Sequence, residues 1–429
     1  MRLMRPKRHQ TLAGMLGAAA LAPVLLVSGC TPATPTVTNV YNRPASGVFT
    51  VTGHGWGHGH GMSQWGAQGA AALGVPSSTI VSTYYPGTQA TVMPNTAIRV
   101  KLTATNSYDL AVLPATGLTV TDGAGHRMGL TAPASMWRVI ADYAGQHLQR
   151  YVNGAWSPVA VAGVSNLTNP VRFTDTASML SVVYPSLYSR DYRGSVSSTV
   201  VAPGVVSNVV TLGMEDYLRG VVPQEASPSW LPAALQAQAI AARTYAAQQR
   251  ATDGGRTYDI CDSTACQFFG GSRLRSANGA VTQIEYPSTD AAIRATAGSI
   301  RTYGGQPAFT QFSSSNGGYS VSGGMPYLVA KPDQWDGAAP NPMHTWTARL
   351  PASALEANFP AVGHLLRIRV TQRDGLGEWG GRVKTVVLEG VDGSGRPTSV
   401  TTTGFGIYYA RMFGSYSDGL RSDWWTVTG

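Results

Sequence analysis

The sequence predicts an α+β protein in which strands outnumber helices, with one lobe built on a long alanine-rich helix and another in β-sandwich or barrel form. Only 12% of the 429 residues are charged, whereas globular chains average about 25%, and there are 50 glycines and 26 prolines. This composition argues against a helical bundle, a coiled coil or an acidic disordered chain. At roughly 100–200 residues per domain, the length allows two to four domains.

Residues 97–212 supply most of the predicted strands. Alternating or β-branched runs, such as 98–102, 118–121 and 205–212, are separated there by glycine, asparagine and aspartate turns. We therefore expect a β-rich lobe at 97–210.

Helices are expected mainly after this lobe. Leu235, Ala239 and Ala242 recur at helical spacing within 232–250, and Pro232 occupies a first-turn position where proline is tolerated. The other expected elements are helices at 63–73, 288–296 and 351–358, and strands at 48–52, 300–312, 366–372 and 382–389.

The first thirty residues are typical of a bacterial secretory signal. Four basic residues precede an apolar run at 12–27, and small residues then precede Cys30. A retained membrane anchor is the alternative, because the run approaches the roughly 20 residues that span a bilayer. The site resembles a lipobox, which predicts a lipid on Cys30 and attachment to the extracytoplasmic face of the cell membrane. Residues 1–29 are then a lipoprotein signal peptide and 30–46 a flexible tether.

The net charge narrows the choice of partner. Removing residues 1–29 takes away four basic residues and no acidic one, so the charge falls from +9 to +5. The remaining excess contains no runs of lysine and arginine, which argues against nucleic acid as a partner. An anionic polymer of the cell envelope fits better.

The segment GHGWGHGHGMSQWGA at 53–67 is the most unusual in the chain. Its glycines permit backbone conformations that side chains forbid, and they would present His54, His58 and His60 from a tight loop. Three interpretations remain open: a metal site with His58 and His60 as ligands, a polar wall of a ligand cleft, or a structural turn.

Glu225 is the candidate acid. It lies between the apolar residues 221–223 and a turn rich in proline and tryptophan. A carboxyl at the rim of an apolar pocket has a raised pKa and can act as a general acid near neutral pH. The alternative is a glutamate at a helix start that interacts with the helix dipole.

Cys261 and Cys266 are the two cysteines left once Cys30 is assigned to lipid. In an oxidising compartment, two cysteines five positions apart form a disulfide by default. Zinc is the alternative, with Asp259 and Asp262 as further ligands, although that stretch contains no histidine.

Four segments together resemble the stage II sporulation protein D family (SpoIID/LytB) of bacterial envelope proteins. They are VVPQEASPSWLPAALQAQAIAARTYA, the cysteine stretch, SSSNGGYS at 313–320, and GHGWGHGHGMSQWGA. The resemblance implies a peptidoglycan lytic transglycosylase, or an enhancer of cell-wall amidases, and places the family's catalytic glutamate on Glu225. Some members bind zinc through a histidine beside the cysteines. Its absence here supports the disulfide, and we expect no metal or other cofactor.

A lytic transglycosylase can work with one carboxyl group, and no second acid obviously partners Glu225. The glutamate protonates the leaving glycosidic oxygen and then, as carboxylate, helps the muramic acid 6-hydroxyl close onto C1, which gives a 1,6-anhydro product. From the matching segments, the predicted substrate-binding residues are His58, Gln64, Arg243, Tyr245, Ser314 and Asn316.

The order of the segments departs from the family pattern. The GHG segment follows the glutamate segment in the family but precedes it here, which indicates a circular permutation. The catalytic lobe would then be split between 47–96 and 211–429. This predicts that the strand at 48–52 and Trp424 are neighbours in space.

The expected function is non-hydrolytic cleavage of peptidoglycan glycan strands by Glu225. The first alternative is a glycan-binding accessory that stimulates a separate cell-wall amidase and makes no cut itself. The second is a metallohydrolase that uses histidine ligands.

Overall fold

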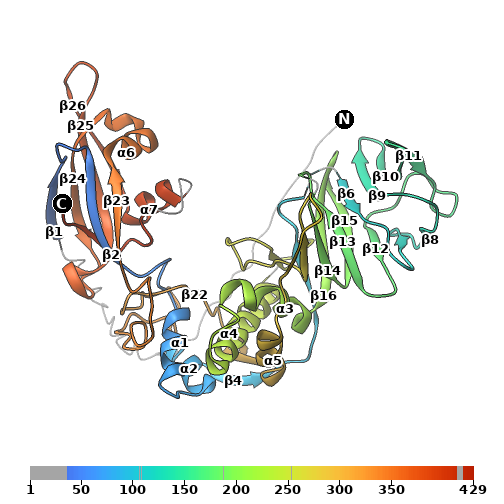
Figure 1. Ribbon diagram of the computed structural model, residues 1–429, viewed down its shortest axis with the longest axis horizontal. Coiled ribbons are helices and arrows are strands. Elements are labelled where there is room, and N and C mark those ends of the chain that lie inside the picture. Colours follow the sequence, from blue (N-terminus) through green and yellow to red (C-terminus); the bar gives the residue numbers. More distant parts are fainter. Residues whose placement is uncertain (1–35, 106, 108, 187, 253, 413–418) are drawn as a thin grey trace, which may run out of the picture.

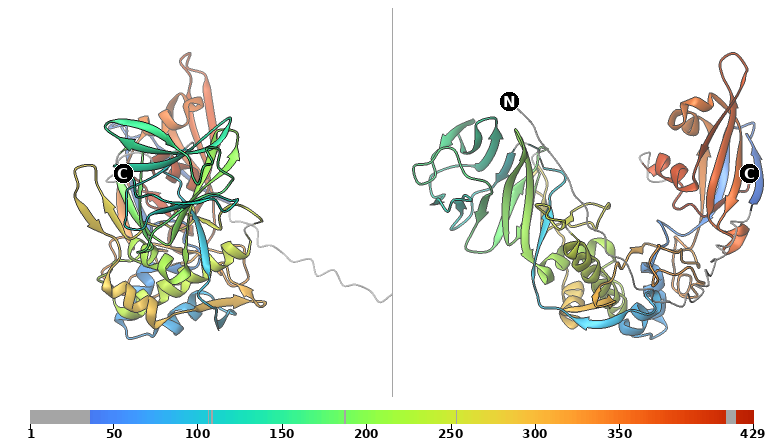
Figure 2. Two further views of the ribbon diagram at one scale, coloured as in Figure 1. Left: turned by 90° about the vertical axis from the view of Figure 1, so that its right-hand side faces the viewer. Right: turned by 180° about the vertical axis from the view of Figure 1, so that it is seen from behind.

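The computed structural model describes residues 36–412, except 106, 108, 187 and 253, together with residues 419–429. The predicted signal peptide and lipidation site at Cys30 lie outside these residues. Two β-rich lobes rise from a helical base and give the molecule the shape of an open U (Figures 1 and 2). Within the described residues, no helix is long and apolar enough to cross a bilayer.

The sandwich lobe consists of two mainly antiparallel sheets that share one core, and neither sheet closes into a barrel. The seven-stranded sheet has the order β17 (Ile260–Cys261), β5 (Ala97–Lys101), β16 (Val205–Gly213), β15 (Ser195–Ala202), β12 (Val171–Thr174), β7 (Thr119–Thr121), β8 (Arg127–Gly129). The eight-stranded sheet has the order β11 (Ala155–Val159), β10 (Gly145–Val152), β9 (Met136–Asp142), β6 (Asp109–Val112), β13 (Met179–Val183), β14 (Ser189–Arg193), β18 (Arg273–Arg275), β19 (Val281–Gln283). Alternating residues such as Val139 and Phe173 fill the core. The lobe therefore extends beyond the predicted 97–210, because strands from 260–283 complete both sheets.

The helical base connects the two lobes. Its helices are α1 (Gln64–Ala72), α2 (Ser77–Tyr84), α3 (Met214–Glu225), α4 (Pro232–Ala251) and α5 (Pro287–Ala295). Its short strands are β3 (Met62–Ser63), β4 (Gln89–Val92), β20 (Ser299–Tyr303), β21 (Gln306–Pro307) and β22 (Phe312–Ser313). The predicted alanine-rich helix is α4, and it packs against all four other helices of the base. Its small buried residues, such as Ala237 and Ala241, allow this close approach.

The outer lobe contains residues 36–54 and the described part of 345–429. One sheet has the order β1 (Thr36–Asn42), β24 (His364–Arg373), β25 (Val383–Val391), β26 (Pro397–Thr402), and the other β23 (Thr345–Pro351), β2 (Val48–His54), β27 (Trp425–Val427). Helices α6 (Ala352–Asn358) and α7 (Gly404–Met412) accompany them. Phe49, Ile368 and Trp425 belong to a core that is separate from the core of the sandwich lobe. The C-terminal part of the predicted catalytic lobe is thus a lobe of its own.

The prediction of a flexible tether over 30–46 is wrong for residues 36–42, which form β1. This strand pairs antiparallel with β24, and Asn42 lies opposite Arg367. The composition of the segment suggested a linker, whereas its alternation of threonine, valine and tyrosine suits an edge strand.

The two separated ends of the sequence meet in this lobe, as predicted. Strand β2 pairs with β27, Val51 lies opposite Val427, and the amide of His54 donates to the carbonyl of Trp424 at 2.9 Å. The neighbouring positions of 48–52 and Trp424 are therefore confirmed. This geometry is the one that a circular permutation requires.

Candidate active site

Glu225 is the last residue of α3. The apolar residues before it, including Val221 and Val222, are buried in the core of the sandwich lobe and draw the end of the helix inward. The alternative interpretation, a glutamate at a helix start, is wrong. At a C-terminus, the helix dipole presents its negative end, which does not stabilise a carboxylate.

The surroundings of Glu225 favour its protonated form. Burial raises the pKa of this carboxyl, while the backbone N–H of Phe268 and the side chain of Gln64 oppose the rise. The Phe268 N–H donates to Oε1 at 2.9 Å. Gln64, the first residue of α1, approaches closely enough to affect the pKa, but its Nε2 completes no hydrogen bond in the described structure.

Two tyrosines also face Glu225. Burial, and then the charge of Glu225, raise the pKa of both Tyr217 and Tyr245. The Tyr245 ring stacks on Phe309 with centroids 5.3 Å apart. Among the described residues, no other carboxyl group contributes to the pKa shift of Glu225. Amide and phenol groups therefore surround the Glu225 carboxyl, and among the described residues the next carboxyl that acts on Tyr217 is that of Asp262.

A disulfide-closed loop holds the Phe268 N–H in place. Cys261 and Cys266 are bonded, with Cα atoms 5.6 Å apart, which confirms the predicted disulfide and uses both thiols. The next residue, Gln267, accepts a hydrogen bond from the Tyr217 hydroxyl at 3.0 Å and donates to the Ala242 carbonyl at 3.3 Å. These contacts fix the chain immediately before Phe268. Among the described residues, no group of three His, Cys, Asp or Glu side chains is placed to hold a metal ion.

The GHG and SSSN segments lie side by side, although about 250 residues separate them in the sequence. Strand β3 pairs in parallel with β22, and the amide of Trp65 donates to the Ser314 carbonyl at 3.0 Å. Gly61 has φ +65°, and a Cβ there would lie 2.0 Å from the Gln311 carbonyl oxygen, so only glycine fits. This pairing brings Gln64 and Ser314 to the same edge of the base. Ser314 is half-buried.

The histidines of the GHG segment occupy two places, with His58 and His60 together and His54 apart from them. The half-buried His58 stacks on His60 with centroids 5.0 Å apart, and its Nδ1 accepts from the His60 amide at 2.9 Å. Burial, then His60 and Arg382, lower the pKa of His58 to about 3, so the ring is neutral at physiological pH. His54 instead lies in the outer lobe, between the rings of Trp379 and Trp424.

Arg243 and Asn316, two of the predicted substrate-binding residues, are inside the protein. Arg243 is 0% exposed, and its Nε and Nη2 donate to the carboxylate of Glu215 at 2.9 and 2.7 Å. Asn316 is also 0% exposed and donates to Asp333 at 2.7 Å. These positions correct the prediction, because both side chains are already committed to partners within the fold.

A buried aspartate organises the loop that follows the SSSN segment, and no local sequence pattern predicts it. Asp336 is 0% exposed and accepts hydrogen bonds from Ser63 at 2.5 Å, Ser315 at 2.8 Å and the Asn316 amide at 3.0 Å. In the sequence it lies in a region rich in glycine, serine and proline, which is typical of a loop. Two further features of the site were not predicted from the sequence. They are Phe268 and the contact between the rings of Trp65 and Trp230, whose centroids are 5.0 Å apart.

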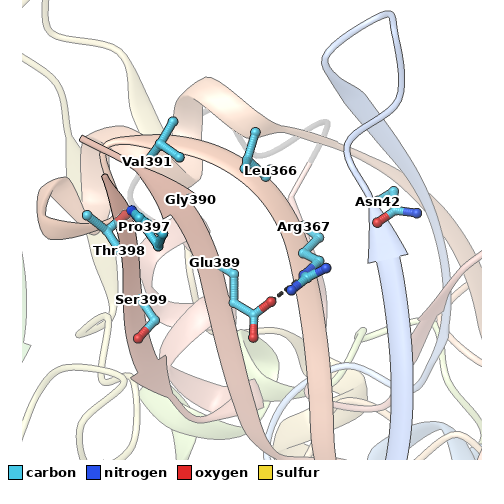
Figure 3. Close-up of a pocket in the computed structure, with 9 residues that line it drawn as sticks. All are labelled: Asn42, Leu366, Arg367, Glu389, Gly390, Val391, Pro397, Thr398 and Ser399. Atoms are coloured by element: carbon cyan, nitrogen blue, oxygen red, sulfur yellow. Dashed lines mark hydrogen bonds and ion pairs between the residues drawn. The ribbon is translucent and has the colours of Figure 1, made fainter. Parts of the chain in front are cut away.

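A groove of about 510 Å³ lies elsewhere, on the four-stranded sheet of the outer lobe (Figure 3). Its only carboxyl group is that of Glu389, which accepts hydrogen bonds from Arg367 and Arg369. The hydrogen bond from Arg367 is the largest cause of the lowered pKa of Glu389. This carboxyl is held as a carboxylate, which does not suit a general acid.

Comparison with known proteins identifies the part of the chain around Glu225. The sequence profile of the family described as Stage II sporulation protein (SpoIID) matches residues 203–303. The chain carries a SpoIID domain. This domain contains Glu225, Tyr245 and the disulfide, so the resemblance that the sequence motifs suggested is confirmed.

Relatives of this chain occur in several bacteria. An amidase enhancer of Bacillus subtilis is 34% identical over 145 residues, which cover 32% of this chain and 17% of that protein. A stage II sporulation protein D of Bacillus amyloliquefaciens is 27% identical over 202 residues, which cover 44% of this chain and 57% of that protein. An uncharacterized protein of Brachyspira hyodysenteriae is 35% identical over 122 residues, which cover 28% of this chain and 30% of that protein. The chain thus spans less than two thirds of each.

Proposed function

We propose that this protein acts on cell-wall peptidoglycan and cleaves its glycan strands without consuming water, with Glu225 as general acid and then general base. The observation that carries the proposal is the carboxyl at the end of α3, whose pKa burial raises. A glutamate with a raised pKa keeps its proton closer to neutral pH and can deliver it to a leaving group.

The reaction needs two proton transfers. The Glu225 carboxyl protonates the glycosidic oxygen as the bond from muramic acid C1 to that oxygen breaks. The 6-hydroxyl of the same muramic acid then bonds to C1 and gives its proton to the Glu225 carboxylate. One strand is released with a new hydroxyl and the other ends in a 1,6-anhydro ring, and the enzyme returns to its starting state.

The surroundings of Glu225 support this route over hydrolysis. Hydrolysing glycosidases use two carboxyl groups, separated by roughly 5–9.5 Å, one of which acts as nucleophile or activates water. Within the described structure, no other carboxyl affects the pKa of Glu225. The half-buried Tyr245 supplies a hydrogen-bonding group for a hydroxyl-rich substrate, and His58 and Ser314 stay candidates for binding it. Gln64 is only 6% exposed, so its position favours a role beside Glu225 over the predicted contact with substrate.

The relatives support a role in the cell wall but do not specify the reaction. A SpoIID profile covers Glu225, and the matched relatives include an amidase enhancer and stage II sporulation proteins. Neither description specifies a bond that is cut. The cleavage itself therefore depends on the chemistry of the Glu225 site.

The test is the Glu225→Gln variant with isolated sacculi and with strands freed of stem peptides. Glutamine can still accept the Phe268 N–H but cannot donate an acidic proton. We expect mass spectrometry to find anhydromuramyl products from the parent protein and none from the variant. Asp216→Asn is the matched control, because Asp216 lies on the same helix with its side chain 46% exposed. Undiminished product release by Glu225→Gln would overturn the proposal.

A second candidate function is stimulation of a separate cell-wall amidase, and the 34% identity to an amidase enhancer favours it. The same groups around Glu225 would then bind a glycan strand without cutting it. Pure protein that releases no new strand ends, but accelerates an added amidase, would select this function.

We also propose that the mature protein is anchored outside the cytoplasmic membrane through a lipid on Cys30. The support is the lipobox-like sequence before this cysteine. A Cys30→Ala variant should lose incorporation of labelled fatty acid and leave the membrane fraction. Equal labelling of both proteins would rule out Cys30 as the lipidation site.

A further inference from the structure

Arg190 is a half-buried cation on β14, near the Glu225 site. Its Nη1 donates to the Gly270 carbonyl at 2.9 Å. Among the described residues no carboxylate lies within ion-pair distance of it, although Arg190 interacts electrostatically with the Asp262 carboxyl at longer range. The neighbouring arginines behave differently. Each of the following pairs with an aspartate or glutamate: Arg193, Arg219, Arg243, Arg273 and Arg275. Arg190 therefore retains N–H donors for another partner, while the Asp262 carboxyl offsets part of its charge.

The position of Arg190 relates it to the candidate active site. Its guanidinium lies 5.8 Å from the centroid of the Phe268 ring, and the amide of the same residue donates to Glu225. Arg190 is not among the groups that shift the pKa of Glu225, so it does not contact the acid itself. Arg190 and Glu225 are thus linked through Phe268, whose ring lies beside the guanidinium and whose amide binds the carboxyl.

Two half-buried aromatic rings lie near this cation. Phe268 is in contact with it, and Tyr188, two residues before Arg190, stacks on Tyr184 with centroids 4.6 Å apart. Both Arg190 and Tyr188 interact electrostatically with Tyr184, which places them together. A cation beside half-buried aromatic rings suits a ligand that combines sugar rings with a negative charge.

We propose that Arg190 binds a carboxylate of the glycan substrate next to the bond that Glu225 cleaves. This inference rests on the proposed function and adds a charge requirement to its substrate. In peptidoglycan, the lactyl group of muramic acid carries a carboxyl, which is free in strands without stem peptides. In intact strands the stem peptide occupies that carboxyl and contributes carboxylates of its own. A guanidinium matches either source through paired N–H donors.

The test measures binding in the Glu225→Gln background, so that cleavage does not contribute. Dissociation constants are determined for three preparations: strands without stem peptides, the same strands with muramic carboxyls reduced to alcohols, and intact strands. Arg190→Gln should weaken binding roughly ten- to hundredfold for the preparation that carries the recognised carboxylate. Arg190→Lys should lie between, because lysine keeps the charge and loses the fork.

The three preparations identify the source of the carboxylate. If the lactyl group is recognised, the loss appears on stem-free strands and disappears when their carboxyls are reduced. If the stem peptide is recognised, the loss appears on intact strands alone. Arg172→Gln is the control, because Arg172 is an exposed arginine on the other sheet of the same lobe. Circular dichroism and the unfolding temperature establish that each variant is folded.

Equal binding of all three preparations by Arg190→Gln and its parent would overturn the inference, as would a parent that binds none of them. This experiment can fail without the proposed function failing, and the reverse also holds. A protein that binds through Arg190 but releases no products would contradict cleavage alone. Cleavage with binding that is insensitive to Arg190 would contradict the charge requirement alone.

Discussion

Glu225 and Glu389 are both half-buried, and their neighbours set their pKa values in opposite directions. Burial raises the pKa of Glu225, whose closest donors are a backbone N–H and an uncharged amide. Arg367 and Arg369 lower the pKa of Glu389 in the groove of the outer lobe. The presence of a spacious groove therefore does not identify the general acid. The better indication is a buried carboxyl that no cation contacts, because burial then raises its pKa.

The largest difference between the two glutamates is expected when each is replaced by glutamine. Glu225→Gln should lower the rate of strand cleavage by about 10²- to 10⁴-fold, the usual contribution of general acid–base catalysis. Glu389→Gln should leave the rate unchanged, since its carboxylate only pairs with surface arginines. Initial rates of product release from strands measure both. A large loss of cleavage rate in the Glu389 variant would indicate that the reaction takes place in the outer lobe.

The disulfide tests whether the Phe268 N–H matters to Glu225. Replacing Cys261 and Cys266 with serine opens a short loop, which should cost about 2 kcal/mol of unfolding free energy. Cleavage should fall as well at temperatures where the variant is fully folded, because the N–H loses its fixed direction. Denaturant unfolding and rate measurements on one preparation separate the two effects. Full activity in the folded variant would show that the loop has only a structural role.

A cation placed beside Glu225 would give it the environment of Glu389. Gln64→Lys introduces an ammonium where the side chain already approaches Glu225. The pKa of Glu225 should fall by about one to three units, and the alkaline limb of the pH–rate profile should move to lower pH by the same amount. Gln64→Met is the control: it removes the amide that opposes the rise in the pKa of Glu225, so its alkaline limb should move to higher pH, opposite to the limb of Gln64→Lys. Profiles of both variants that coincide with the parent would contradict the assignment of Glu225 as the acid.

The two glutamates should also affect stability with opposite dependence on pH. The raised pKa of Glu225 means that its carboxyl favours folding below its ordinary value of 4.5, and that this contribution is lost as pH rises through the folded pKa. Glu225→Gln should therefore unfold at a higher temperature than the parent at neutral pH and lose that advantage in acid. Glu389 has a lowered pKa, so its contribution is present above the ordinary value and is lost as pH falls. Glu389→Gln should unfold at a lower temperature at neutral pH. Shifts of a few degrees, measured by calorimetry from pH 4 to 8, are expected, and equal signs would contradict the comparison.

Local sequence patterns predicted much of what surrounds Glu225. Helical spacing and small residues located α4, and the apolar residues before Glu225 predicted its raised pKa. The order of the motifs predicted that β2 meets the C-terminal strand β27, which the strand pairing confirms. These features depend on residues close in sequence or on segments with distinctive composition.

The sequence could not supply partners that lie far apart. Arg243 was predicted to bind substrate because nothing in its own segment indicated that Glu215, 28 residues earlier, takes its charge. Strand β1 was predicted to be a tether from its composition. Its partner β24 lies more than 300 residues later, so no local pattern indicated the pairing. Arg190 drew no notice for the same reason, since only the folded chain shows that it forms no ion pair among the described residues and lies beside the Phe268 ring.

The most direct measurement of the central claim is the mass of the strand ends that the purified protein releases from isolated sacculi in water enriched in oxygen-18. Cleavage by Glu225 without water predicts 1,6-anhydromuramyl ends that carry no label and are lighter than hydrolysed ends by one water. Reducing ends that contain oxygen-18 would show hydrolysis, and no new ends at all would show that the protein does not cut the strand. Either result would contradict the account.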